Sequence, residues 1–207
     1  MSIRAVIFDL GGVLVRTEDP TPRARLAQSL GMTPSELSRI IYDSETARLA
    51  TLGAITTREH WEAVRRRLGL SAEELKNVPV EFWGGDTLDE ALVNYLRTLR
   101  PRYKTALLSN AWDDLRRVVE ESWMIADAFD EVIISAEVGL AKPDPRIYRL
   151  ALARLDVEPG AAVFVDDFEE NVEGARAVGM QAIQFRSPEQ TLMELEMVLD
   201  QRWNSPP

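Results

Sequence analysis

The chain has no cysteine and only one histidine, His60, among its 207 residues. Without cysteine it cannot form a disulfide, a thiol nucleophile, an iron–sulfur cluster or a thiolate zinc site. A Ser–His–Asp triad would have to use His60. The absence of cysteine fits a cytoplasmic protein.

Positive charge is also scarce, since 24 Lys and Arg stand against 34 Asp and Glu and give a net charge of −10. This balance argues against nucleic acid or an anionic membrane as a partner, although a local pocket for a small anion remains compatible with it. No apolar run approaches the roughly 18 residues of a membrane span, and the short apolar run near the N-terminus, which Asp9 and a Gly pair end, is too short for a signal peptide. We expect a soluble, cytoplasmic protein that is a monomer or a homodimer.

Five short runs are rich in β-forming residues: 3–10, 104–109, 131–135, 161–166 and 181–185. Most are nearly continuous in apolar residues, which is typical of strands buried on both faces of a parallel sheet. Apolar residues at helical spacing lie between the later runs, as in Leu88, Leu92, Leu96 and Leu99. Strands that alternate with helices predict an α/β fold with a doubly wound, Rossmann-like parallel sheet.

Residues 17–86 differ from the rest, because they contain helical patterns (22–30, 35–52, 57–68 and 72–76) and no convincing strand. Thr33-Pro34 and Thr56 with Glu59 are typical of helix N-termini. We predict a small helical domain, 17–86, inserted into a core made of 1–16 and 87–207.

Polar residues stand at or just after the ends of several predicted strands. They are Asp9, Ser109-Asn110, Lys142-Pro143 and Asp166-Asp167. Taken singly, each is compatible with a turn or a helix cap. In open α/β sheets, however, ligands bind at the carboxyl ends of the strands. The adjacent acids would repel one another unless a positive charge lies between them, and a divalent cation would supply that charge.

Together these residues are the set that phosphoryl transfer through an aspartyl-phosphate requires. A carboxylate nucleophile meets repulsion from an anionic phosphate, which Mg²⁺ and a lysine would offset.

With these residues the sequence resembles the haloacid dehalogenase superfamily of phosphohydrolases. Four motifs match in order across nearly the whole chain: VIFDLGGVL (6–14), LLSN (107–110), KP (142–143) and VFVDD (163–167) with Asn171. Within the superfamily the sequence is similar to bacterial sugar-phosphate phosphatases, including those for glucose 1-phosphate, and to the N-terminal phosphatase domain of soluble epoxide hydrolases. The run KPDPRIY (142–148) is typical of that group.

The resemblance implies a sheet in the order 5-4-1-2-3 and a helical cap that selects a small phosphorylated substrate, expected to be a sugar phosphate. It implies that Asp9 is the nucleophile. Ser109 and the Asn110 backbone would bind the phosphoryl group, and Lys142 would hold the phosphate. The implied Mg²⁺ ligands are Asp9, the Gly11 carbonyl and Asp167, with Asp166 acting through a bound water and Asn171 orienting the loop.

One departure concerns Gly11, because most phosphatases of this superfamily carry a second Asp two residues after the nucleophile. A glycine donates no proton, and the loss of general acid–base help costs about 10²–10⁴-fold. A good leaving group, a metal-bound water or Asp113 would compensate.

Two alternatives remain open. Gly11 also motivates a weak or degenerate member that binds a phosphorylated ligand or a partner. The other alternative is a 2-haloacid dehalogenase, which also lacks the second Asp but usually lacks the acid pair as well.

Three further residues, Trp83, Trp112 and Arg16, are candidates to line the opening under the cap, although core or surface roles are the simpler interpretation. His60 lies away from every motif, and we expect it on the surface or packed between helices.

Overall fold

The computed structural model describes residues 2–199, and its centre is a five-stranded parallel sheet. The strands are β1 (Ala5–Phe8), β4 (Lys104–Ser109), β5 (Glu131–Ile134), β6 (Ala162–Asp166) and β7 (Gln181–Gln184). They lie in the order β5-β4-β1-β6-β7 and every neighbouring pair is parallel. Counted among the five predicted strands, this is the order 5-4-1-2-3 read from the other edge, so the predicted fold class and strand order are confirmed.

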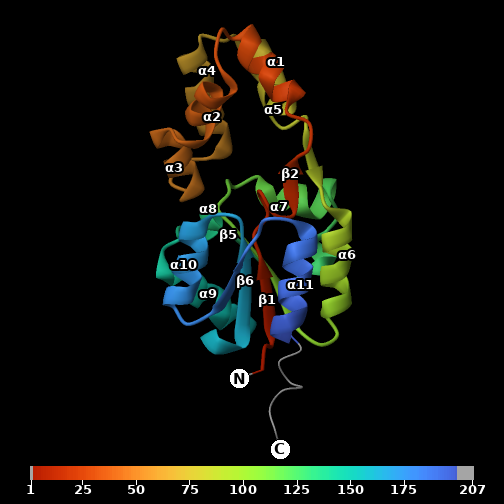
Figure 1. Cartoon of the computed structure of the whole chain (residues 1–207). Helices are drawn as coiled ribbons and strands as arrows, with labels where there is room; N and C mark the ends of the chain where they lie inside the picture. The colour runs from red at the N-terminus through yellow and green to blue at the C-terminus, as the bar shows by residue number, and fades with distance from the viewer. Residues whose placement is uncertain (1, 200–207) are drawn as a thin grey trace, which may run out of the picture.

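Helices cover both faces of this sheet (Figure 1). Because successive side chains of a strand point to opposite faces, Val6 and Phe8 enter one cluster of buried residues, and Ala5 and Ile7 enter another. The first cluster includes side chains of α6 (Glu90–Leu99) and α11 (Pro188–Leu199). The second includes side chains of α9 (Pro145–Leu155) and α10 (Glu169–Ala177). Every residue of β1 and β6 is buried, which explains their unbroken apolar sequences.

Short helical turns complete the part of the chain around the sheet. They are α7 (Leu115–Arg117), a π-helical turn (Val118–Ser122), α8 (Ser135–Val138), and 3₁₀ turns at Ala126–Ala128 and Pro159–Ala161.

The helical segment, which stands above the sheet in Figure 1, is made of five helices. They are α1 (Thr21–Ser29), α2 (Pro34–Tyr42), α3 (Glu45–Thr51), α4 (Thr57–Leu68) and α5 (Ala72–Phe82). They share a cluster of buried residues of their own, which also takes in Trp112 from the loop after β4. Capping boxes begin α2 at Thr33 and α4 at Thr56, as the sequence predicts.

Two predictions for this segment need correction. The predicted helix 35–52 is two helices, because Asp43 ends α2 and the Ser44 hydroxyl accepts the Ala47 N–H to begin α3. The helix predicted at 72–76 continues through Pro79 to Phe82.

A short antiparallel pair joins the helical segment to the sheet, although the sequence showed no convincing strand there. It consists of β2 (Val15–Thr17) and β3 (Asp86–Leu88). Each strand has only three residues and neither is fully buried, so neither carries the apolar signature of a strand. The predicted domain boundaries at 16/17 and 86/87 fall within this pair and stay a prediction, while residues 1 and 200–207 lie outside the described part. No helix described here is both long and apolar enough to cross a membrane.

Candidate active site

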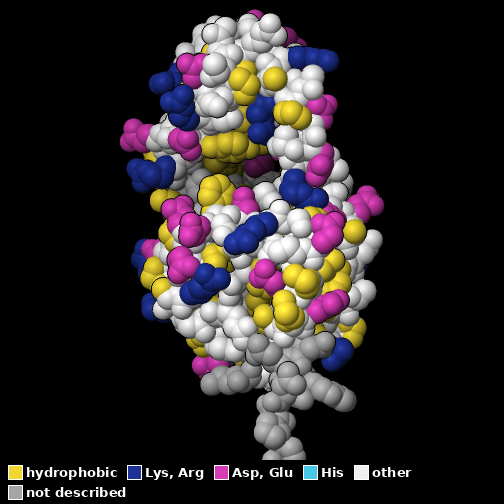
Figure 2. Space-filling view, in the orientation of Figure 1, with side chains coloured by type: hydrophobic (Ala, Val, Ile, Leu, Met, Phe, Trp, Pro, Cys, Tyr) yellow, Lys and Arg dark blue, Asp and Glu magenta, His cyan; other side chains and the backbone are white. Residues whose placement is uncertain are grey.

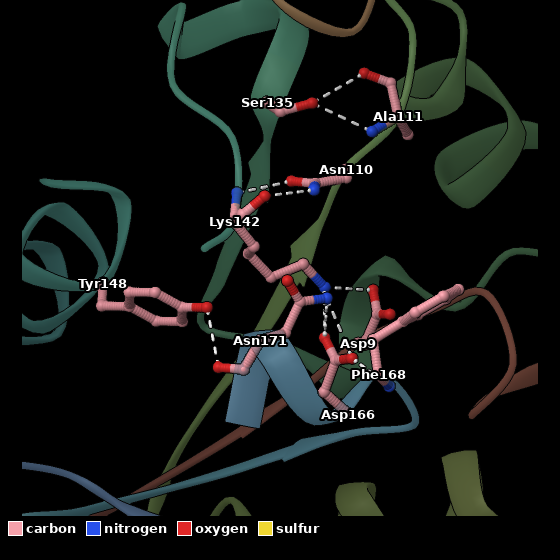
Figure 3. Close-up of polar contacts among 9 residues, drawn as sticks. All are labelled: Asp9, Asn110, Ala111, Ser135, Lys142, Tyr148, Asp166, Phe168 and Asn171. Carbon is pink, nitrogen blue, oxygen red and sulfur yellow. Dashed lines mark hydrogen bonds and ion pairs between the residues drawn. The ribbon is translucent and has the colours of Figure 1, made fainter. Parts of the chain in front are cut away.

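Four segments distant in sequence bring their polar residues to the carboxyl edge of the sheet (Figure 3). Asp9 directly follows β1, Ser109 ends β4, and Asp166 ends β6. Since β1 lies between β4 and β6, Asp9 stands at the centre of this edge. The Asp9 N–H continues the ladder by donating to the Val165 carbonyl at 2.9 Å, which fixes the carboxylate at the strand end.

A buried lysine joins two of the carboxylates. The Lys142 Nζ lies 2.7 Å from Asp9 Oδ1 and 2.6 Å from Asp166 Oδ2. The side chains of Lys142 and Asp166 are 1% and 0% exposed. Buried charges of this kind persist only where they are paired and hydrogen-bonded, so removal of one partner is costly for the others.

The backbone of Lys142 is held by the side chain of Asn110. The Asn110 Nδ2 donates to the Lys142 carbonyl at 2.9 Å, and the Lys142 N–H donates to Asn110 Oδ1 at 2.8 Å. One residue further along the loop after β4, the Ala111 N–H donates to Ser135 Oγ, which in turn donates to the Ala111 carbonyl. Sequence reasoning assigned only the Asn110 backbone to the site, and it missed this clamp of the side chain on a distant loop.

Asp166 is held in place by two groups that follow it in the chain. The Phe168 N–H donates to its Oδ1 at 2.8 Å, and Asn171 Nδ2 lies 3.0 and 3.1 Å from its two carboxylate oxygens. The buried Tyr148 hydroxyl donates to the Asn171 carbonyl at 2.8 Å. Tyr148 belongs to the KPDPRIY run, but the sequence carries no signal that its hydroxyl reaches this network.

Asp9, Asp166 and Asp167 form a group suited to an oxygen-liganded cation. One carboxylate oxygen from each lies within 4.8 Å of the others. The Asp167 Oδ1 is buried and has no hydrogen-bond partner among the described residues. Gly12 has a φ of +77°, and a Cβ there would overlap the Asp167 carboxylate, whose carbon would lie 2.5 Å away. The backbone thus makes room for Asp167, and the donor set fits a hard divalent cation.

The electrostatics of the edge also favour a cation. Burial raises the pKa of Asp9 to about 7, against the lowering effect of Lys142 and with a further increase from Asp166. Burial, followed by repulsion from Asp166, raises the pKa of Asp167 above its usual range. Lys142 pairs with two of the three carboxylates, so a bound cation would stabilise the ionised forms of all three.

The position of Gly11 is open. Gly11 is exposed, and a Cβ built there meets no other atom within 4 Å. Asp113, which sequence reasoning considered as a substitute acid, is engaged elsewhere, because its Oδ1 accepts both the N–H and the hydroxyl of Thr57 at the start of α4.

The remaining candidates lie in the helical segment, in the loop after β4 and in β2. Trp83 and Trp112 contact one another with ring centroids 6.0 Å apart. Arg16 donates to the Val13 carbonyl and to Asp89. His60 is fully buried in the helical segment, where its ring lies 4.5 Å from that of Trp112 and its Nδ1 lies 2.9 Å from Thr46 Oγ1.

Comparisons with known proteins agree with this geometry. A family model described as haloacid dehalogenase-like hydrolase matches residues 3–179. Bifunctional epoxide hydrolase 2 of Sus scrofa is 31% identical over 96% of this chain and 39% of its own length. A sesquiterpene phosphatase of Aspergillus oryzae is 29% identical over 96% of this chain and 97% of its own length.

Solved structures share the fold. A HAD family enzyme from Bacteroides thetaiotaomicron, in complex with magnesium and inorganic phosphate, has a TM-score of 0.76 and 22% identity, and the match covers 90% of this chain and 96% of that one. The chain spans about two fifths of the epoxide hydrolase.

A substitution of Gly12 tests the carboxylate group. We expect Gly12→Ala to displace Asp167 and to weaken Mg²⁺ or Mn²⁺ binding about 10- to 100-fold, the usual effect when support for a metal ligand is lost. The positive φ adds about 1–2 kcal/mol of strain. Titration calorimetry measures the binding and thermal unfolding measures the stability. Gly11→Ala is the matched control, since it meets no neighbour; equal affinities in both variants would contradict the proposed site.

The raised pKa of Asp9 predicts how stability depends on pH. Its folded pKa of about 7 exceeds the unfolded value of 3.8, so the folded protein holds more protons between these pH values. The metal-free protein should therefore lose stability as pH rises from about 4 to about 7. Addition of Mg²⁺ should raise Tm more at pH 8 than at pH 5.5, because binding needs the ionised carboxylates. Thermal unfolding with EDTA and with Mg²⁺ measures both effects. In Asp9→Asn the fall with pH should be smaller, and an unchanged fall would assign it to other groups.

Proposed function

The chain belongs to the haloacid dehalogenase-like hydrolase family, and we propose that it is a Mg²⁺-dependent phosphatase of a small phosphomonoester. The observation that carries this proposal is the position of Lys142 Nζ, within 2.7 Å of carboxylate oxygens of both Asp9 and Asp166. Beside them, Asp167 Oδ1 has no hydrogen-bond partner in the part of the chain that the structure describes. This arrangement supports the proposal, because a candidate nucleophile, a fixed positive charge and candidate cation ligands lie at one edge of the sheet.

In the proposed mechanism, a carboxylate oxygen of Asp9 attacks phosphorus and the bond from phosphorus to the ester oxygen breaks. The ester oxygen leaves with that electron pair as an alkoxide and takes a proton from water to give the alcohol. Water then attacks the aspartyl-phosphate, loses a proton, and releases phosphate and the free Asp9 carboxylate. Together the two steps consume one water molecule and convert one phosphomonoester into an alcohol and inorganic phosphate.

The chain's own residues stabilise the charge in these steps. Lys142 would offset the charge of Asp9 and contact the phosphoryl oxygens, while the Ser109 hydroxyl and the Asn110 N–H would donate to them. Asn110 also keeps Lys142 in place through its side chain. Asp9, Asp167 and the Gly11 carbonyl would hold Mg²⁺ with Asp166 beside them, and the cation would supply positive charge against the repulsion between carboxylate and phosphate.

The comparisons support a substrate that carries a phosphate group, and they give less support for any particular organic group. One relative is a sesquiterpene phosphatase, and the Bacteroides thetaiotaomicron enzyme was solved with magnesium and inorganic phosphate. The sugar phosphate implied by sequence resemblance stays a prediction, as do the cap role of the helical segment, the cytoplasmic location, the monomeric or dimeric state and the absence of nucleic-acid and membrane partners.

Two alternative functions are compatible with the family. A 2-haloacid dehalogenase would need no metal, which leaves no role for the Asp167 Oδ1, a buried oxygen without a hydrogen-bond partner among the described residues. A binder without turnover is motivated by Gly11, but Asp9, Lys142 and Asp167 would then be kept together without catalysis. Metal dependence and turnover separate these functions.

Replacement of the nucleophile is the most direct test. We expect Asp9→Asn to lower phosphate release from p-nitrophenyl phosphate and sugar phosphates by roughly a thousandfold or more, as removal of a covalent nucleophile does. EDTA should abolish the wild-type activity and Mg²⁺ should restore it. Circular dichroism controls for folding. Activity that survives in folded Asp9→Asn, or in EDTA, would contradict the mechanism.

Gly11→Asp tests the missing acid. The open space at Gly11 accommodates the new side chain, so the variant should fold and bind Mg²⁺. Its kcat for alkyl phosphates, whose alcohols are poor leaving groups, should rise about 10²-fold or more, whereas kcat for p-nitrophenyl phosphate should change little. Gly11→Asn is the control with the same shape and no acid. An equal response to both leaving groups would indicate that another group already donates the proton.

A further inference from the structure

Aromatic side chains from three separate segments meet between the helical segment and the sheet. Tyr42 ends α2, Trp83 follows α5, and Trp112 lies in the loop after β4. The Trp112 ring centroid lies 6.0 Å from that of Trp83 and 6.3 Å from that of Tyr42, and Trp83 Nε1 donates to the Tyr42 hydroxyl at 2.6 Å. We name these three residues the aromatic wall.

The aromatic wall begins at the catalytic edge. Trp112 is two residues beyond Asn110, whose side chain holds the backbone of Lys142. Figure 2 shows a hollow between the upper and lower parts of the molecule, with hydrophobic side chains on its upper side. Tyr42 is 47% exposed and Trp83 is partly exposed, so part of the wall is accessible. A phosphate bound at the sheet edge would leave its organic group on this side.

Polar side chains next to the aromatic wall are bonded within the protein. Arg23 donates to the Phe82 carbonyl and pairs with Asp86, and its guanidinium lies 4.3 Å from the Phe82 ring centroid. Asp113 accepts from Thr57. The Trp83 N–H is used by Tyr42. A hydroxyl-rich group placed here would have to compete with these bonds, whereas an apolar group would only displace water.

We propose that the aromatic wall binds the organic group of the substrate, and that this group is apolar or aromatic rather than a sugar. The inference rests on the proposed function, because it assumes that the phosphate binds at Lys142 and the carboxylate group. It assigns Tyr42, Trp83 and Trp112 to substrate recognition, a role distinct from the chemistry at Asp9.

A series of alkylphosphonates tests this inference without any dependence on leaving groups. Methyl-, butyl- and hexylphosphonate would be titrated into the Mg²⁺-loaded protein by calorimetry, with inorganic phosphate and glucose 1-phosphate for comparison. Glucose 1-phosphate is an ester that the active protein would hydrolyse, so it is titrated into the Asp9→Asn variant. We expect affinity to rise with chain length by up to about fourfold for each buried methylene. Hexylphosphonate should bind more tightly than glucose 1-phosphate.

Variants of the aromatic wall locate the effect. Trp83→Ala and Tyr42→Ala should each weaken hexylphosphonate binding about tenfold, equivalent to ~1.4 kcal/mol, and leave inorganic phosphate binding unchanged. Tyr42→Phe keeps the ring and should keep most of the affinity. Val80→Ala is the matched control, because Val80 is a 71% exposed apolar residue of α5 outside the aromatic wall.

The outcomes separate this inference from the proposed function. If inorganic phosphate binds but affinity is independent of chain length, or if glucose 1-phosphate binds most tightly, the inference is overturned and the phosphatase stands. If Trp83→Ala and Val80→Ala have equal effects, the wall is not the binding surface. If inorganic phosphate fails to bind in the presence of Mg²⁺, both proposals fall.

Discussion

The buried contact of Lys142 with Asp9 and Asp166 is the constraint on which the rest of the site depends. Transfer of these charges from water is costly, and only close pairing and further hydrogen bonds offset that cost. The Asn110 clamp fixes the lysine, the Phe168 N–H and Asn171 fix Asp166, and the ladder bond to Val165 fixes Asp9. Three strands and two loops therefore have to assemble correctly before the charges are satisfied, which links the stability of the sheet edge to the geometry of the proposed active site.

One oxygen of the carboxylate group is left without a partner among the described residues, and a cation would fill that role. Lys142 contacts two carboxylates, while Asp167, close to both, keeps a buried oxygen that has no hydrogen-bond partner within residues 2–199. The structure supports this arrangement at Gly12, where only the absence of a side chain lets Asp167 approach. Burial, with a smaller contribution from repulsion by Asp166, raises the pKa of Asp9 and Asp167, and the same repulsion would give the site its affinity for a divalent cation. Binding and catalysis would thus use charge that folding leaves uncompensated.

Sequence predicted the sheet well because buried parallel strands need continuous apolar runs, and β1 and β6 have them. It also placed Asp9, Ser109 and Asp166 at strand ends, where parallel topology brings them to one edge, and Lys142 in the segment that follows the third predicted strand. It missed β2 and β3, since three-residue strands carry no periodicity, and it joined α2 to α3, because a single hydroxyl at Ser44 makes the break. The contacts of Asn110 with Lys142 and of Tyr148 with Asn171 span 32 and 23 residues, and no local pattern encodes such distant bonds.

The open position at Gly11 and the aromatic wall favour the same kind of substrate for independent reasons. Without a proton donor at Gly11, the ester oxygen leaves most easily when its alcohol is acidic, as a phenol with a pKa near 10 is. Aromatic rings also bury well against Tyr and Trp. Binding energy from the organic group, far from phosphorus, can further lower the barrier if it positions the ester for attack by Asp9. An aryl phosphate would meet both conditions, whereas a sugar phosphate, with a poor leaving group and many hydroxyls, would meet neither.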